Sequence, residues 1–199
     1  MTPTTENTAE LLDTPQLIER LGSADFAQAQ AAAAALQAQG AAVLEALVAG
    51  LSHPNWRVRK ECAGLMDHLA DDRCVEPLRR ALTDPRVAVR RLALHALGCQ
   101  PCKPAPLQAD IVSLLIERAR EDPSRRVRQV ATHLLGLQPY DARTMAALQA
   151  ILAQETDPKV RSRAEYALQA QEKQAASAGA AVSCHRSVVS DHRVSSGKD

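Results

Sequence analysis

The feature that most constrains this chain is a nine-residue motif, V-R-x-x-A-x-x-x-L, which occurs four times in 199 residues, with Cys62 and Met66 as variants in the first copy. The copies begin at four valines separated by 31, 38 and 33 residues: Val58, Val89, Val127 and Val160. Each copy follows an X-Pro pair, and each X-Pro pair follows another apolar segment with helical spacing. Four copies at such similar spacing indicate a repeat architecture in which every unit is a pair of helices.

The chemistry of the motif explains its spacing. Val, Ala and Leu at offsets 0, +4 and +8 lie on one stripe of an α-helix, and the small central residue lets a neighbouring helix approach closely. Asp is a good N-cap and Pro suits the first helical turn, so each X-Pro pair predicts the start of a helix. Arg at offset +1 lies at the edge of the stripe, where we expect it to reach the capping Asp of the adjacent repeat.

A degenerate copy precedes these four, with a helix start at Thr14-Pro15 and Ala32 and Leu36 at the Ala and Leu positions. The sequence therefore predicts an all-α fold, a right-handed α-solenoid of about five helical pairs. We expect the pairs at about 15–39, 41–70, 73–98, 107–137 and 142–171, which together form one repeat domain over 15–171. Residues 1–14 are expected to be flexible, and 172–199, rich in Ser, Ala and Gly, are expected to be a disordered tail.

Three features depart from the pattern. The stretch "GCQPCKPAPLQ" between the third and fourth pairs contains three prolines, which predict an extended loop. The pair Asp157-Pro158 stands two residues closer to its Val-Arg than in the other copies, which predicts a shortened turn. In the first copy His53 replaces Asp, so its link to a neighbouring Arg is not expected to follow the pattern.

The D-P…V-R-x-x-A-x-x-x-L sets resemble the HEAT repeat family, especially the short bacterial HEAT-like repeats also found in phycobiliprotein lyases. The resemblance covers about 41–171 and extends more weakly to 15. It implies that the second helix of each pair lines a concave surface. The positions opposite the apolar stripe, at offsets −1, +2, +3 and +6, then form a modestly basic groove, in which Glu61 is the one acid. Its predicted binding residues are Arg57, Lys60, Arg91, His95, Arg126, His133, Lys159, Arg163 and Tyr166.

Composition and charge narrow the function classes. Hydrophobic residues make up 46% of the chain but aromatic residues only 2%, so Ala and Leu carry a core suited to helix-on-helix packing. The net charge is +1; residues 1–51 carry one Arg against six acids, and residues 52–171 carry 19 basic against 14 acidic residues. This mild excess is weak for a nucleic-acid-binding protein, which would also need more aromatic side chains than Trp56 and Tyr166 for stacking on single strands.

No pattern in the sequence predicts catalysis or a cofactor. Cys99 and Cys102 form a CxxC without a second pair, which favours two loop cysteines with no shared task over a redox or intermolecular metal role. His95 and His133 recur at offset +6, which indicates a surface feature of the repeat, and neither HExxH nor a His-Glu dipeptide occurs. We therefore expect no catalytic residues, no metal and no cofactor. The N-terminus lacks a signal-peptide pattern and no apolar run spans a membrane, so we expect a cytoplasmic protein without a membrane partner.

The leading functional hypothesis is a non-enzymatic scaffold that binds an acidic or extended segment of another protein in its concave groove. A simpler interpretation is that the basic positions only keep the exposed helix faces soluble. Nucleic-acid binding, as in HEAT-like DNA glycosylases, and a role as accessory subunit of a lyase-type enzyme are the alternatives.

Overall fold

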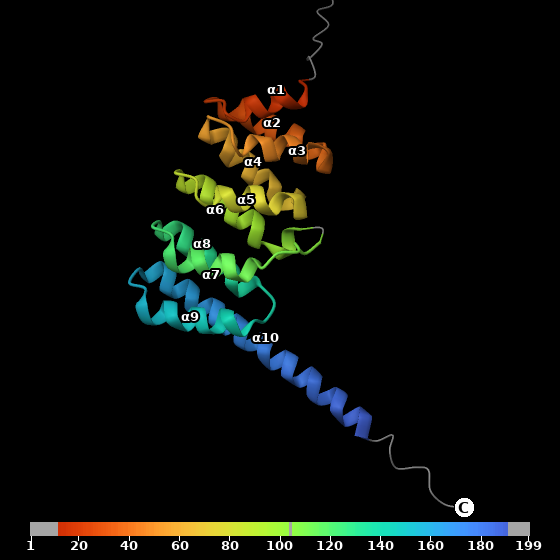
Figure 1. Ribbon diagram of the computed structural model, residues 1–199, viewed down its shortest axis with the longest axis vertical. Helices are drawn as coiled ribbons and strands as arrows, with labels where there is room; N and C mark the ends of the chain where they lie inside the picture. Colours follow the sequence, from red (N-terminus) through yellow and green to blue (C-terminus); the bar gives the residue numbers. More distant parts are fainter. Residues whose placement is uncertain (1–11, 104, 191–199) are drawn as a thin grey trace, which may run out of the picture. The chain divides into compact units, whose positions relative to one another are not determined.

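A computed structural model describes residues 12–103 and 105–190 of the chain, and the regular secondary structure of this part is all helical, with no strand. Each predicted pair consists of two helices (Figure 1). The first helices of the pairs are α1 (Thr14–Arg20), α3 (Leu44–Gly50), α5 (Val75–Ala81), α7 (Ile111–Glu121) and α9 (Ala142–Gln154). The second helices are α2 (Phe26–Ala38), α4 (Trp56–Leu69), α6 (Val87–Gly98), α8 (Arg125–Leu137) and α10 (Pro158–Ser190). The chain is thus an all-α solenoid of helical pairs, as predicted.

The described residues divide into two compact units. Unit 1 contains the chain up to Leu97 together with Pro101–Gln108, and therefore α1 to α6. Unit 2 contains the short junction Gly98–Gln100 and the chain from Ala109 onwards, and therefore α7 to α10.

The valine that opens each motif has the same place in every copy. Val58, Val89, Val127 and Val160 are each the third residue of their helix, and each is fully buried. The central small residue of the motif is also fully buried in all four copies: Cys62, Ala93, Ala131 and Ala164. The motif is therefore the buried seam of every second helix.

The role of the X-Pro pair differs between the copies. In the fourth copy Pro158 is the first residue of α10, and the Asp157 carboxylate accepts the N–H of Lys159 at 2.9 Å, as the sequence predicts. In the three longer copies the helix begins two residues after the proline, so the expected helix start is wrong there. In one of these, the Asp84 carboxylate accepts the N–H of Arg86 at 2.7 Å and closes a turn before α6. The two residues missing from the fourth copy are the turn, as the shortened spacing predicted.

The expected link from Arg to the next repeat forms in unit 1. Arg59 Nε lies 2.6 Å from Asp84 Oδ2, and its Nη1 donates to the carbonyl of His53 at 2.8 Å. The guanidinium therefore joins the turn before its own helix to the turn before α6. His53, which replaces Asp in the first copy, lies 3.1 Å from Glu19 of α1 instead.

Buried glutamines close the C-terminal ends of helices in unit 2, a feature that the sequence reasoning missed. Gln171 Nε2 donates to the carbonyl oxygens of Leu135 and Gln138, at 3.2 and 2.8 Å. Gln138 Nε2 donates to Gly98 O at 2.7 Å and to Leu134 O at 3.0 Å. The last carbonyls of a helix lack intrahelical donors, so these side chains satisfy groups that would otherwise be buried unpaired.

The expected tail differs from the structure. We expected disorder from residue 172, but α10 continues to Ser190. The five residues directly after Gln171 are Glu, Lys, Gln, Ala and Ala, which are strong helix formers and extend a helix already anchored by Val160. Residues 191–199, and residues 1–11 of the expected flexible N-terminus, lie outside the described part of the chain. In the Cys-Pro stretch a short 3-10 turn, η3 (Gln100–Cys102), precedes the loop.

A substitution at Gly136 tests how closely α8 packs on α10. A Cβ added at Gly136 would lie 2.9 Å from the Cα and the Cβ of Ala167, so part of the obstacle is backbone. We expect Gly136→Ala to lower the free energy of unfolding by about 1–3 kcal/mol, although Ala is the better helix former. Urea denaturation followed by circular dichroism measures the change. The matched control is Gly64→Ala, whose new Cβ would lie 3.4 Å from Leu92 Cδ1; equal effects in the two variants would contradict the packing argument.

A second variant tests the arginine link between repeats. The side chains of Arg59 and Asp84 are only 15% and 8% exposed, so Arg59→Met leaves a nearly buried carboxylate without its charged partner. We expect a loss of about 1–3 kcal/mol in the free energy of unfolding, measured by urea denaturation. Arg79→Met is the control, because the Arg79–Glu76 pair is more than half exposed on both sides and should contribute less than about 0.5 kcal/mol. A loss no larger than that of the control would show that the link is dispensable.

Candidate functional site

The nine predicted binding residues lie on the second helices of the pairs and divide between the two units. The unit 1 face consists of Arg57 and Lys60 on α4 and Arg91 and His95 on α6. The unit 2 face consists of Arg126 and His133 on α8 and Lys159, Arg163 and Tyr166 on α10.

Acidic neighbours offset part of the positive charge of the unit 1 face. Lys60 Nζ lies 2.6 Å from Glu61 Oε1, and His95 Nε2 lies 3.3 Å from Asp67 Oδ2. Arg57 is exposed, and its guanidinium carbon lies 5.3 Å from the centre of the Trp56 ring. Arg91 is the other exposed cation of this face.

The unit 2 face keeps its positive charge. Arg126, Lys159 and Arg163 are exposed, and Tyr166 is 61% exposed. The other residues at the predicted offsets on these two helices are neutral: Gln129, Val130 and Ser162. Three exposed cations and an exposed phenol, carried by α8 and α10, are side chains of the kind that bind carboxylates or phosphates.

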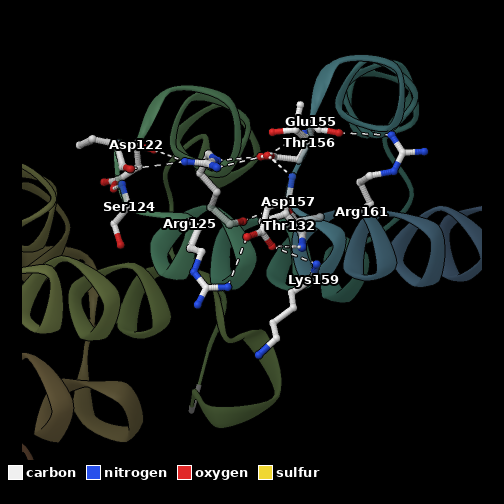
Figure 2. A network of polar contacts seen from close by, with 12 residues as sticks. Asp122, Ser124, Arg125, Thr132, Glu155, Thr156, Asp157, Lys159 and Arg161 are labelled. Carbon is white, nitrogen blue, oxygen red and sulfur yellow. Dashed lines mark hydrogen bonds and ion pairs between the residues drawn. The ribbon is translucent and has the colours of Figure 1, made fainter.

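Other basic residues of unit 2 have a structural task, and Figure 2 shows their contacts. Arg128 Nε lies 2.7 Å from Glu155 Oε2, and its Nη1 donates to the carbonyl of Asp122 at 3.1 Å. Arg125 Nη1 lies 3.3 Å from Asp157 Oδ2. Arg128 is the motif arginine, and it reaches Glu155 rather than Asp157, whose carboxylate caps α10.

The titration of Glu155 reflects this contact. Its hydrogen bond from Arg128 lowers the pKa of the Glu155 carboxyl below its ordinary value, and the pKa of Arg128 is raised by the same bond. The carboxylate therefore stabilises the fold above its ordinary pKa and loses this contribution as the pH falls through the lowered value. Arg125 and Arg128 thus form ion pairs with residues of other segments, whereas the side chains of Arg126 and Lys159 are exposed to solvent.

A cluster at the C-terminal ends of α4 and α6 was missed by the sequence reasoning. The ligand atoms of Asp67, His95 and Cys102 all lie within 4.8 Å of one another. The side chain of Lys103 is fully buried, and its Nζ lies 3.9 Å from Asp67 Oδ1 and 3.4 Å from Asp67 O. Asp67 stands at offset +9 from Val58, on the same face as the predicted positions, so extending the series by three residues would have found it.

The pKa of Asp67 follows from this surrounding. Burial raises the pKa of the carboxyl, but the hydrogen bond and the charge of His95, with the charges of Lys103 and His68, outweigh burial and lower it overall. Asp67 is therefore a carboxylate at neutral pH. A carboxylate, an imidazole and a thiol in mutual reach are the donor types of a transition-metal site.

Clefts lie elsewhere on the two units. One of about 380 Å³ is bordered by α7 and α9 in unit 2, and one of about 280 Å³ lies between α3 and α5 in unit 1. None of the nine predicted residues lines either cleft. The predicted residues thus form exposed faces of helices rather than the walls of these clefts.

Among the described residues no single helix has both the length and the apolar character needed to cross a bilayer. Only α2 together with the segment Gly40–Gly50 meets both criteria, and the two parts meet at an angle of 117°.

Comparisons with known proteins agree with this architecture. The complex of CpcE and CpcF of phycocyanin lyase from Nostoc sp. PCC7120 superposes with a TM-score of 0.66 at 22% identity, over 77% of this chain and 96% of the matched chain. The crystal structure of an engineered protein superposes with a TM-score of 0.50 at 19% identity, over 81% and 80% of the two chains. No curated protein matches. A profile of HEAT repeats matches residues 14–98 and 75–169, and the chain with its four V-R-x-x-A-x-x-x-L seams therefore belongs to the HEAT repeat family.

Proposed function

We propose that this protein is a non-enzymatic scaffold that binds an acidic segment of a partner protein on the unit 2 face. The observation that carries the proposal is the charge of that face: three exposed cations and no acid at the predicted offsets of α8 and α10. A repeat scaffold presents such faces along a rigid framework, so a partner meets cations whose spacing is set by helix packing.

The nearby ion pairs support this assignment. Arg125 forms an ion pair with Asp157, and Arg128 forms one with Glu155. The exposed cations Arg126 and Lys159 are therefore carried by helices that these ion pairs already hold in place. A partner carboxylate then meets side chains on a preorganised surface, which lowers the ordering cost of association. Tyr166, 61% exposed next to Arg163 on the same turn of α10, adds apolar contact area and a hydroxyl.

The unit 1 face fits a weaker role in this proposal. Glu61 and Asp67 lie against Lys60 and His95, so Arg57 and Arg91 remain as its exposed cations. A solved relative in fold is a complex of two proteins, CpcE and CpcF, which favours a protein partner here over nucleic acid. A cytoplasmic location stays a prediction.

Charge reversal tests the unit 2 face. We expect Arg126→Glu/Arg163→Glu to weaken binding of a fluorescent oligoglutamate peptide at least about tenfold, because two attractive contacts become repulsive. Fluorescence anisotropy measures the affinity, and circular dichroism verifies that helicity is retained. Arg80→Glu/Arg120→Glu changes the net charge equally on two exposed positions of first helices and should bind like the wild type. Equal losses in both double variants would refute a specific face.

The reversal Arg57→Glu/Arg91→Glu compares the two units. We expect it to weaken peptide binding less than the unit 2 reversal does, because acids already offset part of the charge of the unit 1 face. A larger loss would transfer the assignment to unit 1.

A salt titration separates the protein from the nucleic-acid alternative. We expect a single-stranded oligonucleotide of the same formal charge as the peptide to bind no more tightly than the peptide. Three cations would give a slope of log affinity against log salt of only about −2, since single strands contribute about −0.7 per phosphate contact. Tighter oligonucleotide binding with a much steeper slope would overturn the proposed partner class.

A further inference from the structure

We propose that Asp67, His95, Cys102 and Cys99 form a binding site for a divalent cation of the zinc type. The inference is independent of the proposed partner-binding role of the unit 2 face. It gives His95 the task of a metal ligand in place of the partner contact that the sequence predicts.

Three of the four donor groups lie close together in space. The ligand atoms of Asp67, His95 and Cys102 lie within 4.8 Å of one another, and His95 Nε2 is 3.3 Å from Asp67 Oδ2. In a tetrahedral site with bonds of about 2.0–2.3 Å, neighbouring donor atoms stand about 3.3–3.8 Å apart. The donors are therefore already close to the separation that a bound ion requires. They come from α4, α6 and η3, so an ion would join three segments that are separate in the chain.

The spacing along the chain supplies the fourth ligand. His95, Cys99 and Cys102 form the pattern H-x3-C-x2-C, in which Cys99 directly follows the last residue of α6. Residues four apart at a helix end project to the same side, and the x2 spacing is that of paired cysteine ligands. We therefore assign Cys99 from its place in the chain between His95 and Cys102. Two sulfurs, one imidazole and one carboxylate match the preference of a borderline-soft cation.

The charges around the site suit a bound dication. A dication with two thiolates and the Asp67 carboxylate has a net charge of −1, and the fully buried ammonium of Lys103, 3.9 Å from Asp67, makes the site neutral. Lysine is among the residues least often buried without a compensating charge. The Asp67 carboxylate already supplies such a charge. In a metal centre with a net charge of −1 the Lys103 ammonium stays compensated, and the ion also binds the Cys-Pro loop to α4 and α6.

The alternative for these residues is a metal-free polar network in which His95 and Lys103 serve only Asp67. The two interpretations differ in what they require of the thiols. A metal site needs Cys102 and Cys99 as thiolates, whereas the polar network works without them.

Cobalt titration of the full-length protein decides between them. After removal of bound metal with a chelator under reducing conditions, we expect one equivalent of Co²⁺ to produce visible d–d bands of a tetrahedral site and a thiolate-to-cobalt charge-transfer band. One equivalent of Zn²⁺ should abolish both sets of bands, and it should also raise the melting temperature. A protein that stays colourless on Co²⁺ addition would overturn the proposal.

Matched variants identify the ligands. Cys102→Ser and His95→Ala should weaken Co²⁺ binding at least about 100-fold, in keeping with the loss of one ligand from four. Cys99→Ser should lower the charge-transfer intensity by about half, because one of two sulfurs is lost. The controls are His68→Ala, whose exposed imidazole lies 3.7 Å from Asp67 Oδ2 outside the ligand group, and Cys74→Ala, a buried cysteine outside it.

Circular dichroism of the metal-free proteins shows which variants fold, and only folded variants are compared. Unchanged Co²⁺ spectra in Cys102→Ser and His95→Ala, or equal losses in His68→Ala, would place the metal elsewhere and refute the assignment. An unchanged spectrum in Cys99→Ser alone would refute the fourth ligand. Partner binding by Arg126→Glu/Arg163→Glu does not enter these measurements, so either proposal is refuted without the other.

Discussion

The close approach of helices at small residues is the constraint on which the rest of this structure depends. The middle of each motif helix is Ala or Cys, fully buried, and at Gly136 even one methyl group would collide with the backbone of α10. With almost no aromatic residues, the chain gains its apolar burial from many short contacts rather than a few large ones. The seam tolerates little change in volume at Gly136, because part of what its new Cβ would meet is the backbone of α10.

The arginines of the repeat have two roles: some form partly buried contacts that link segments of the fold, and others are exposed on a helix face. Arg59 and Arg128 stand at the same motif position, and each is held by a carboxylate and by backbone carbonyls of the turn before its helix. Arg126, two residues from Arg128, faces solvent. A shift of two positions on a helix is about 200°, which places the first arginine at the joint between elements and the second on an open face.

Two acids outside the fixed positions of the motif, Glu61 and Asp67, change the charge of the unit 1 face, and Asp67 also belongs to the proposed metal site. Glu61 was visible within the repeat offsets, but its contact with Lys60 was not, because both side chains can adopt many rotamers. Asp67 lies beyond the last offset of the motif, and its approach to His95 follows from how α4 and α6 pack. The positive charge of the unit 1 face was therefore overestimated, whereas the unit 2 positions are free of such acids.

The sequence by itself determined the solenoid of helical pairs, the buried seam and the shortened fourth turn, since these follow from local periodicity and the positions of proline. It also determined which side of each second helix is polar. Only the tertiary structure decided which of these polar residues remain exposed, that Arg128 meets Glu155, and that Asp67 and His95 reach Cys102. The physical reason is that these contacts join residues about 25–40 positions apart. Their distances depend on helix packing, which a repeat pattern specifies only on average.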